Sequence, residues 1–252
     1  MIFATFNIAH CSDYSNPKEN GECRITPEKV AKVLKRTKAQ VIGLNEVYDY
    51  GERKEFCSQT EKLSKLLGYE SFVYATGKEF PWKDVIGNAQ ISKYRIKNVK
   101  TYPVLSPSEQ ERNPKETEWY EDRVIIKTVF ETEQGDIAVI NTHFGLNPQE
   151  QKNMINKLLS ILQSETLPCV LMGDFNSEPD SKILRPLYEI MVSAGEYMGH
   201  KDDFTFSSYN PYVTLDYIFF SKHFNIKGYY IDKEIISDHL AIYAEADLKE
   251  NK

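Results

Sequence analysis

Short apolar runs of strand length recur along the whole chain, and segments with a helical period separate them. Alternating or continuous apolar residues over this length are typical of β-strands. Because such strands and helices are interleaved to both ends, with no long linker, the sequence predicts a single α/β domain over residues 1–252. We predict strands at 2–8, 41–47, 70–76, 86–92, 96–104, 123–132, 136–142, 168–172, 213–221, 226–232 and 239–247.

The helical segments have recognisable starts. The clearest helix begins at Asn147, an N-cap residue followed by Pro148 in the first turn and Glu150 at the capping-box position. Other helices are predicted from Thr26 and over residues 60–67. In chain order, the residues expected to face the core are Val30, Val33, Leu34 and Thr37, then Leu63, Leu66 and Leu67, and finally Ile155, Leu158, Leu159 and Leu162.

The composition is that of a soluble globular protein, with 41% hydrophobic and 27% charged residues. No run approaches the roughly 18 apolar residues of a membrane span, so an integral membrane protein is not expected. The segment from Met1 to Asn7 has no basic n-region and no long apolar h-region, and it matches a strand. We therefore expect no signal peptide and a cytoplasmic location.

The cysteines have no metal-binding spacing. Cys11, Cys23, Cys57 and Cys169 include no Cys-x-x-Cys pair, which argues against a zinc site. Reduced, structural thiols are expected. Cys11 and Cys23 bracket a polar loop and could pair in an oxidising compartment, which their spacing alone does not decide.

The charge balance and one long segment bear on the substrate. With 31 Lys+Arg and 37 Asp+Glu, the net charge of -6 gives no footprint for tight, sequence-independent nucleic-acid binding, although it does not exclude nucleic acid. Residues 103–120 contain several prolines and little apolar periodicity, so we predict a long surface loop. This loop could set substrate choice or be a solvated insertion.

Polar residues follow the apolar runs where many predicted strands end. Ligands in α/β folds gather at the carboxyl ends of strands, so these positions predict a site. Taken alone, Gly173-Asp-Phe-Asn176 is more typical of a plain turn than of a site. The polar groups at or near strand ends are Asn7, Asn45, Glu46, Asn141, Thr142, His143, Asp174, Asn176, Asp216, Asp238 and His239.

In this order the clusters resemble the motifs of the endonuclease/exonuclease/phosphatase superfamily, from residue 2 to residue 247. No single motif is specific, but the ordered set is. The resemblance implies a four-layer α/β sandwich of the deoxyribonuclease I type, with two mixed sheets face to face and helices outside. The motifs are Thr5-Phe-Asn7, Leu44-Asn-Glu46, Gly87-Asn-Ala-Gln-Ile-Ser92, Asn141-Thr-His143, Gly173-Asp-Phe-Asn176, Leu215-Asp-Tyr217 and Ser237-Asp-His239.

The resemblance also implies a Mg²⁺ or Mn²⁺ site at one edge of the sheets. Mg²⁺ is usually held through one or two carboxylates, waters and substrate phosphate oxygens. We expect Glu46 to be the main ligand and Asp238 to bind the ion directly or through water. Asn7 is expected to support the ion or its waters, although an isolated Asn after a strand is usually a turn former.

Other residues are expected to act on water and phosphate. Asp174 orients or deprotonates the attacking water, and Asn176 holds a phosphate oxygen or Asp174 itself. His239 stabilises charge on the phosphate or acts as base, while Asp216 fixes its tautomer. His143 contacts the phosphate or assists the leaving group, unless it is structural.

The motifs do not fix the roles of one arginine and three histidines. Arg123 could add a phosphate contact, or could be a surface arginine. His10, His200 and His223 match no motif and receive no role, although His10 lies close enough to Asn7 for a substrate contact.

The predicted activity is hydrolysis of a phosphoester by a monomeric Mg²⁺- or Mn²⁺-dependent phosphodiesterase or nuclease, with water as nucleophile and nucleic acid among the candidate substrates. A phosphomonoesterase or a lipid or sphingomyelin phosphodiesterase is the alternative. The tryptophan-containing variant of the Gly-Asp motif and the Cys-Asp-Arg element of phosphoinositide phosphatases are missing, which disfavours that class. A non-catalytic binding module of the same fold is the rival from another class.

Overall fold

Two six-stranded mixed β-sheets form the centre of the molecule, in the strand orders β11-β12-β1-β2-β4-β3 and β5-β6-β7-β8-β10-β9. The computed structural model describes residues 1–249 except 20, 50–57, 82–83 and 113–118. The strands are β1 (Ile2–Asn7), β2 (Val41–Tyr48), β3 (Ser71–Glu79), β4 (Val85–Ser92), β5 (Arg95–Val104), β6 (Arg123–Thr132), β7 (Gly135–His143), β8 (Cys169–Asp174), β9 (Val192–Ser193), β10 (Asp216–Phe220), β11 (Phe224–Asp232) and β12 (Ala241–Leu248).

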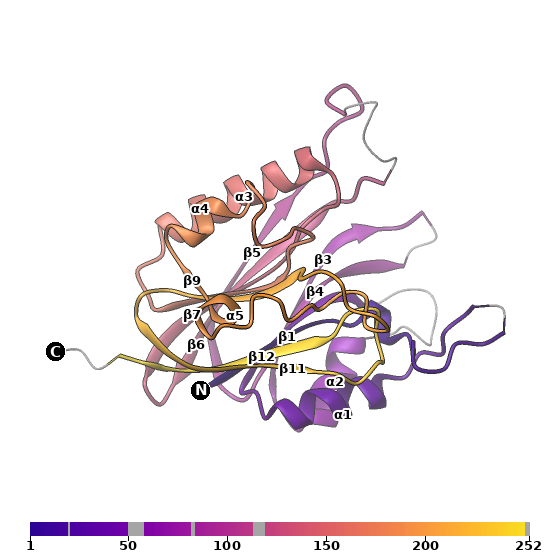
Figure 1. Ribbon diagram of the computed structural model, residues 1–252, viewed down its shortest axis with the longest axis horizontal. Helices are drawn as coiled ribbons and strands as arrows, with labels where there is room; N and C mark the ends of the chain where they lie inside the picture. Colours follow the sequence, from indigo (N-terminus) through magenta and orange to yellow (C-terminus); the bar gives the residue numbers. More distant parts are fainter. Residues whose placement is uncertain (20, 50–57, 82–83, 113–118, 250–252) are drawn as a thin grey trace.

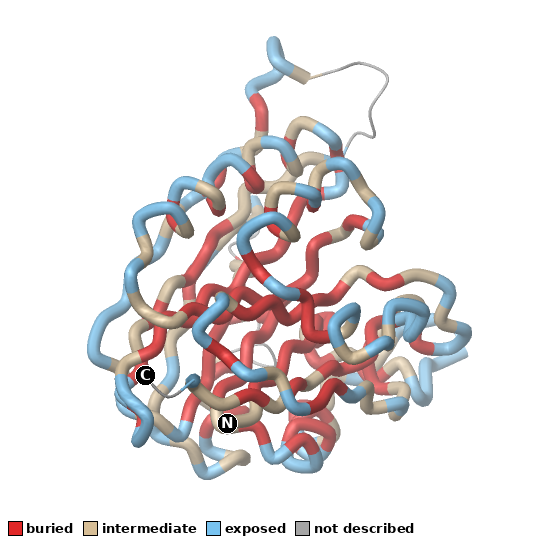
Figure 2. Tube along the Cα trace, turned by 60° about the vertical axis from the view of Figure 1, so that its left-hand side comes forward, coloured by how far each residue is buried: buried red, intermediate tan, exposed pale blue. Residues whose placement is uncertain are grey.

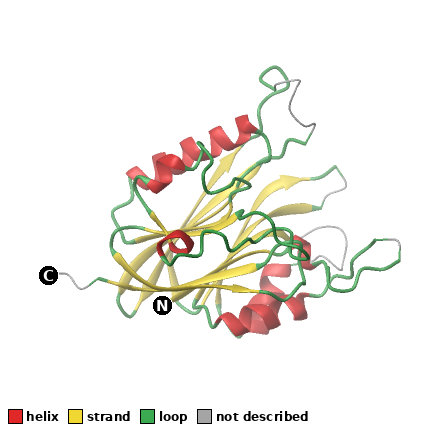
Figure 3. Cartoon of the chain, in the orientation of Figure 1, coloured by secondary structure: helices red, strands yellow, loops and turns green. Residues whose placement is uncertain are grey.

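Helices cover the outer faces of the two sheets (Figures 1 and 3). Side chains of α1 and α2 pack on the sheet that contains β1, and those of α3 pack on the sheet that contains β7. The predicted four-layer arrangement is therefore confirmed. The helices are α1 (Pro27–Thr37), α2 (Gln59–Leu67), α3 (Pro148–Gln163), α4 (Arg185–Tyr188) and α5 (Ala194–Tyr197), with a 3₁₀ turn, η1, at Ala9–Cys11.

A closed apolar layer joins the inner faces of the two sheets. Phe3 of β1 contacts Phe220 of β10 at a ring-centroid distance of 5.5 Å, and Val170 and Ile218 are fully buried in the same cluster. Successive strand residues point to opposite faces. Ala4 and Phe6 therefore pack under α1 and α2 instead. Figure 2 shows the resulting buried centre with exposed loops and helix surfaces around it.

The predicted helix starts and faces are largely observed. Asn147 and Glu150 form the expected capping box of α3. The face of α1 is buried as predicted. In α3, Ile161 is buried whereas Leu159 and Leu162 are only partly buried, because the buried stripe continues from Met154 and Leu158 to Ile161.

Strand pairing brings the polar strand ends to one edge. β1 runs parallel to β2 and β7 runs parallel to β8, so the carboxyl ends of each pair coincide. β12, β10 and β6 are antiparallel to β1, β8 and β7, so their amino ends lie at that same edge. This register explains why motifs far apart in sequence converge.

Several short or irregular segments differ from the prediction. No predicted element corresponds to β9, α4 or α5, because four residues or fewer are too short to show a period. The strand predicted over 213–221 is limited to β10, since Val213 instead forms an isolated bridge with Phe206.

The remaining predictions of organisation have mixed outcomes. Cys11, Cys23 and Cys169 are free thiols, while Cys57 lies outside the described residues. The first two residues of the predicted loop over 103–120, Pro103 and Val104, belong to β5, and 113–118 lie outside the described residues. Within the described chain, no helix combines the length and apolar character needed to cross a bilayer. The single-domain partition stays a prediction.

Candidate active site

Glu46 leaves the regular pleat of β2 at a β-bulge. The register between β2 and β4 shifts between Leu44 and Val47, and Glu46 has a φ of 53°. A bulge of this kind re-aims one side chain away from the face it would otherwise occupy. The partly exposed carboxylate of Glu46 consequently lines the pocket at the sheet edge.

Gly173 allows β7 and β8 to approach closely just before Asp174. Its φ is 142°, and a Cβ at this position would lie 1.9 Å from the carbonyl oxygen of Thr142. Only glycine tolerates both conditions. The following residues, Asp174 and Asn176, are thereby held beside His143, which pairs with Asp174 across the strands.

Asn7 connects the two carboxylates that the sequence assigned to different roles. Its Nδ2 donates to Glu46 Oε1 at 3.1 Å and to Asp174 Oδ2 at 3.0 Å, while its Oδ1 accepts from the backbone N–H of Ala9. An amide nitrogen has no lone pair for a cation. Asn7 as a metal ligand is therefore not supported by this orientation, in which it positions Glu46 and Asp174 instead.

Asp174, His239 and Asp216 form a buried chain of charged groups. His239 Nδ1 lies 2.8 Å from Asp216 Oδ2, and its Nε2 lies 3.5 Å from Asp174 Oδ2. Because a carboxylate only accepts, Nδ1 of His239 carries a proton. Burial would lower the pKa of His239, but the charges of Asp216 and Asp174 raise it to about 10. The imidazole is thus held as a cation.

The pKa of Asp174 is higher than that of an ordinary aspartic acid. Burial raises its pKa to about 7, and this outweighs the lowering by the positive charge of His239. Its Oδ1 accepts from the N–H of Asn176 at 2.9 Å, and its own N–H donates to Asn45 Oδ1. A buried acid with a pKa near neutrality is suited to proton transfer.

His143 is held in one tautomer by Arg123. Arg123 Nη1 lies 3.0 Å from His143 Nδ1, and because arginine only donates, Nδ1 must accept. Burial and the charge of Arg123 lower the pKa of His143 well below its ordinary value. The proton of neutral His143 is therefore on Nε2, which lies 3.3 Å from Asn176 Nδ2. His143 Nε2 also lies 3.5 Å from Asp174 Oδ2, and Asn176 Nδ2 donates one of its hydrogens to the carbonyl of Phe144.

Arg123 is not a surface arginine. Its side chain is 13% exposed and its Nη2 pairs with Glu121 at 3.1 Å. Its Nε is buried and has no partner among the described residues. Arg123 lines the same pocket as His143, where it shares its charge with Glu121.

The carboxylates of Glu46 and Asp238 have no balancing lysine or arginine within the described chain. Burial, followed by the charge of Glu46, raises the pKa of Asp238. Neither carboxylate forms an ion pair with a lysine or arginine there, and both line one pocket. Two hard oxygen donors in this position fit Mg²⁺ or Mn²⁺.

A second group of possible metal ligands lies deeper. Asp174, Asp216 and His239 bring one ligand atom each to within 4.8 Å of one another, so this buried group could hold a metal ion. The bond of 2.8 Å between His239 and Asp216 would have to break to admit an ion between them. The pair of Glu46 and Asp238 requires no such break, and we consider it the better cation site.

One pocket of about 260 Å³ contains most of the predicted residues. Asp216 and Asn7 lie behind it and contact residues that line it. The sequence did not single out its apolar walls, Trp119, Leu146 and Phe206. Phe206 packs on His239 at a ring distance of 4.8 Å, and Trp119 is 68% exposed. No motif marks these residues, since isolated apolar residues in loops are common.

Asn45 and Asn141 bridge the two sheets beneath the pocket. Asn45 Nδ2 donates to Asn88 Oδ1 and to the Thr142 carbonyl, and Asn141 Nδ2 donates to the carbonyls of Leu44 and Ala89. Both are fully buried. Asn45 and Asn141 are predicted from the sequence only as polar residues at strand ends, with no assigned role. An amide inside an otherwise apolar strand was the available signal, because buried amides need buried partners.

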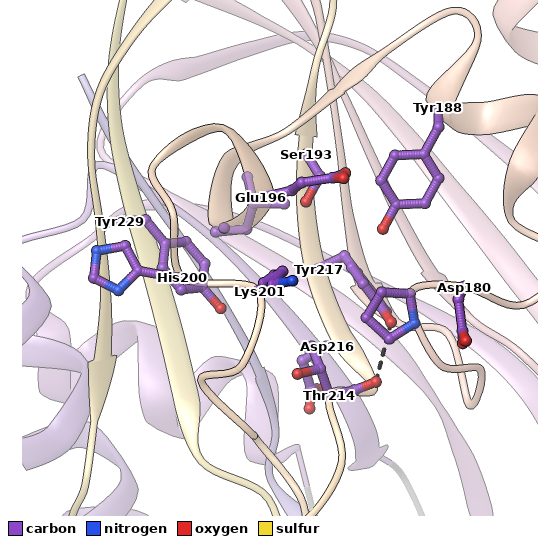
Figure 4. Close-up of a pocket in the computed structure, with 13 residues that line it drawn as sticks. Asp180, Tyr188, Ser193, Glu196, His200, Lys201, Thr214, Asp216, Tyr217 and Tyr229 are labelled. Atoms are coloured by element: carbon purple, nitrogen blue, oxygen red, sulfur yellow. Dashed lines mark hydrogen bonds between the residues drawn. The ribbon is translucent and has the colours of Figure 1, made fainter.

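A second pocket, of about 230 Å³, lies against Asp216. Tyr188, Tyr217 and Tyr229 stand around it, and the Tyr217 hydroxyl donates to the carbonyl of Thr214 at 3.0 Å (Figure 4). Asp216 Oδ1 is buried without a partner among the described residues, whereas Oδ2 holds His239. Asp216 therefore connects this pocket to the imidazole of the first.

The sequence matches the family model described as "Endonuclease/Exonuclease/phosphatase family" over residues 4–239. A search of curated proteins found no significant match. The folds of several solved structures are similar to the fold described above. One is an endonuclease/exonuclease/phosphatase from Beutenbergia cavernae, with 19% identity and a TM-score of 0.80, covering 98% of this chain and 71% of that one.

Two further structures share the fold. The mannosyl-6-phosphatase Bt3783 of Bacteroides thetaiotaomicron has 14% identity and a TM-score of 0.74, with 98% and 100% of the two chains covered. The human Nocturnin catalytic domain, solved with a bound sulfate anion, has 16% identity and a TM-score of 0.69, with 99% and 94% covered. The predicted deoxyribonuclease I-like architecture is thus confirmed.

Proposed function

Because the chain belongs to the endonuclease/exonuclease/phosphatase family, we propose that it is a Mg²⁺- or Mn²⁺-dependent phosphoester hydrolase of the phosphodiesterase or nuclease type. The observation that carries this proposal is the arrangement of Asp174 between Asn7 and the cation His239, at the base of a pocket. A buried carboxylate with a raised pKa inside a pocket is more typical of catalytic sites than of binding modules, which supports the proposal.

Asp174 is the proposed general base. Its ionised form accepts a proton from a water that attacks the phosphorus in line with the leaving oxygen. Asn7 and the N–H of Asn176 fix the two carboxylate oxygens, so the base does not need to reorient during the reaction. His239, held by Asp216, keeps its positive charge next to the phosphate and stabilises the negative charge of the transition state.

The other pocket residues are proposed to hold the phosphate. His143 Nε2 and Asn176 Nδ2 donate to one phosphate oxygen, and Arg123 supplies positive charge behind His143. Glu46 and Asp238 would hold the divalent cation. When bound, that cation acts as a Lewis acid toward the phosphate and as a template for its orientation.

The pocket limits the substrate. Its walls are apolar at Trp119, Leu146 and Phe206, and its volume of about 260 Å³ is large enough for a phosphate group. This favours a phosphoester whose non-phosphate part is planar or apolar, such as a nucleotide diester. The same small volume also supports the alternative of a phosphomonoesterase, and one structural relative is a mannosyl-6-phosphatase.

A substrate screen tests the proposal. Purified protein is incubated with Mg²⁺ or Mn²⁺ and single- or double-stranded DNA, RNA, nucleotide diesters, sugar phosphates, phosphoinositides or sphingomyelin. We expect turnover of at least one phosphoester, none after EDTA treatment, and none with Asp174→Asn. Turnover that persists in EDTA, or none across the panel, would contradict the proposed function.

A further inference from the structure

His10 lies against the proposed cation site although no motif includes it. It belongs to η1, where Ala9, His10 and Cys11 all have positive φ values, that of His10 being 59°. Its carbonyl accepts from Gln59 Nε2 at 2.6 Å, and its ring packs edge-on against Tyr48 at 4.3 Å. The ring is therefore held in place by contacts on both backbone and side chain.

The backbone of Glu46 selects the tautomer of His10. His10 Nδ1 lies 3.1 Å from the carbonyl oxygen of Glu46, which can only accept, so Nδ1 carries the proton. In the neutral ring this leaves the lone pair on Nε2. Histidines that bind metal ions commonly donate their other ring N–H to a backbone carbonyl in this way, which orients the ligating nitrogen.

The two carboxylate oxygens of Glu46 are used differently. Oε1 accepts from Asn7 Nδ2 at 3.1 Å. Oε2 faces His10 Nε2 at 3.6 Å, which is longer than a hydrogen bond. Adjacent ligands of an octahedral ion with bonds of about 2.1 Å lie about 3.0 Å apart, so the two atoms would have to close by a few tenths of an ångström to share one ion. Among the residues that the structure describes, neither Glu46 Oε2 nor His10 Nε2 has a hydrogen-bond partner, and the two atoms face each other.

We propose that His10 Nε2 is a ligand of the divalent cation held by Glu46, which gives this site a nitrogen donor in addition to its carboxylates. The inference rests on the proposed metal dependence. First-row transition ions accept an imidazole ligand more readily than Mg²⁺, which prefers oxygen donors, and Mn²⁺ is the weakest binder of that series. The site therefore selects Mn²⁺ over Mg²⁺ through His10.

Pulsed electron paramagnetic resonance of the Mn²⁺-loaded protein, together with calorimetric titration with Mn²⁺ and Mg²⁺, tests this role. The variant is His10→Asn, because asparagine tolerates the left-handed φ of this position. The control is His223→Asn at an exposed position in contact with Ser221. Thermal unfolding in EDTA checks that both variants are folded.

We expect an imidazole ¹⁴N coupling in the wild type and in His223→Asn, and its loss in His10→Asn. Mn²⁺ binding to His10→Asn should be at least about tenfold weaker. Mg²⁺ binding should change by less than about threefold, since oxygen ligands dominate its coordination. If the wild type binds Mn²⁺ and the coupling survives in His10→Asn, the proposed role of His10 is refuted while the proposed metal dependence stands. If the wild type binds neither ion, the proposed metal dependence is refuted as well.

Discussion

At the scale of single residues, Asp174 combines burial with contacts that favour its charged form. Its pKa is raised by burial to about 7, while His239 and Asn7 act to lower it. A carboxylate that is costly to ionise in the folded state contributes little stability through its charge. Its placement is better explained by proton transfer than by folding.

Replacing Asp174 by Asn should separate these two roles. We expect kcat to fall by about 10²–10⁴-fold, because the proton acceptor is lost. The melting temperature should fall by about 10 °C or less, because the side chain keeps its size but offers one acceptor oxygen in place of the two that accept from Asn7 and Asn176. Steady-state kinetics and thermal unfolding measure the two effects. A large loss of melting temperature with similar kcat would indicate a structural role.

The pH dependence of kcat/KM with Mg²⁺ should follow the ionisation of Asp174 and of His239. Asp174 must be ionised to accept a proton, so activity rises with pH through about 7. His239 must be protonated, so activity falls through about 10.

In Asp216→Asn the alkaline limb should move downward toward the ordinary value of 6.5, because the largest contribution that raises the pKa of His239 is lost. Rates between pH 5 and 11 provide the comparison. An alkaline limb at the same pH in Asp216→Asn would show that His239 is not the titrating group.

The sequence identified the polar side chains at strand ends but not how they pair. Glu46, Asp174 and His239 were predicted because each belongs to a motif. The amide orientation of Asn7 and the approach of His10 depend on tertiary contacts between segments far apart in the chain. Such contacts leave no periodic signal in sequence.

At the scale of elements, long strands and helices were predictable and short ones were not. The strand β7 and the helix α3 have apolar periods over nine and sixteen residues. β9 has two residues, so its pairing with β10 follows from the surrounding fold rather than from its own pattern.

The close contact of β7 and β8 depends on Gly173. In Gly173→Ala we expect a loss of stability above about 4 kcal/mol, from backbone strain and the clash with Thr142. The matched control is Gly135→Ala, because Gly135 also has a positive φ of 120° but has open space around its Cβ position. There we expect about 1–2 kcal/mol. Denaturant unfolding gives both values. Equal losses of stability in the two variants would show that the close approach of β7 and β8 at Gly173 adds nothing to the cost of the substitution.

At the scale of the whole molecule, the carboxylates of Glu46 and Asp238, which pair with no lysine or arginine of the described chain, should make stability depend on divalent cations, although the charge of His239 partly offsets that of Asp238. Binding to the folded state alone stabilises by about 2.7 kcal/mol at a hundredfold excess over Kd. This corresponds to a rise in melting temperature of about 5–10 °C for a chain of this size.

Glu46→Gln should abolish that rise. In EDTA it should melt no lower than the wild type, because its repulsion with Asp238 is gone. The exposed Glu70→Gln is the control and should keep the full response. A cation-dependent rise retained in Glu46→Gln would place the ion elsewhere, with the group of Asp174, Asp216 and His239 as the next candidate.

The proposed activity requires that the pocket hydrolyse a phosphoester with the help of a bound cation. The most direct measurement is the rate of bis(p-nitrophenyl) phosphate hydrolysis as chelated protein is titrated with Mn²⁺ or Mg²⁺. We predict no turnover without cation, a saturable rise as either ion is added, and loss of that rise in Asp174→Asn. A rate that is independent of the cation, or unchanged in Asp174→Asn, would contradict the account.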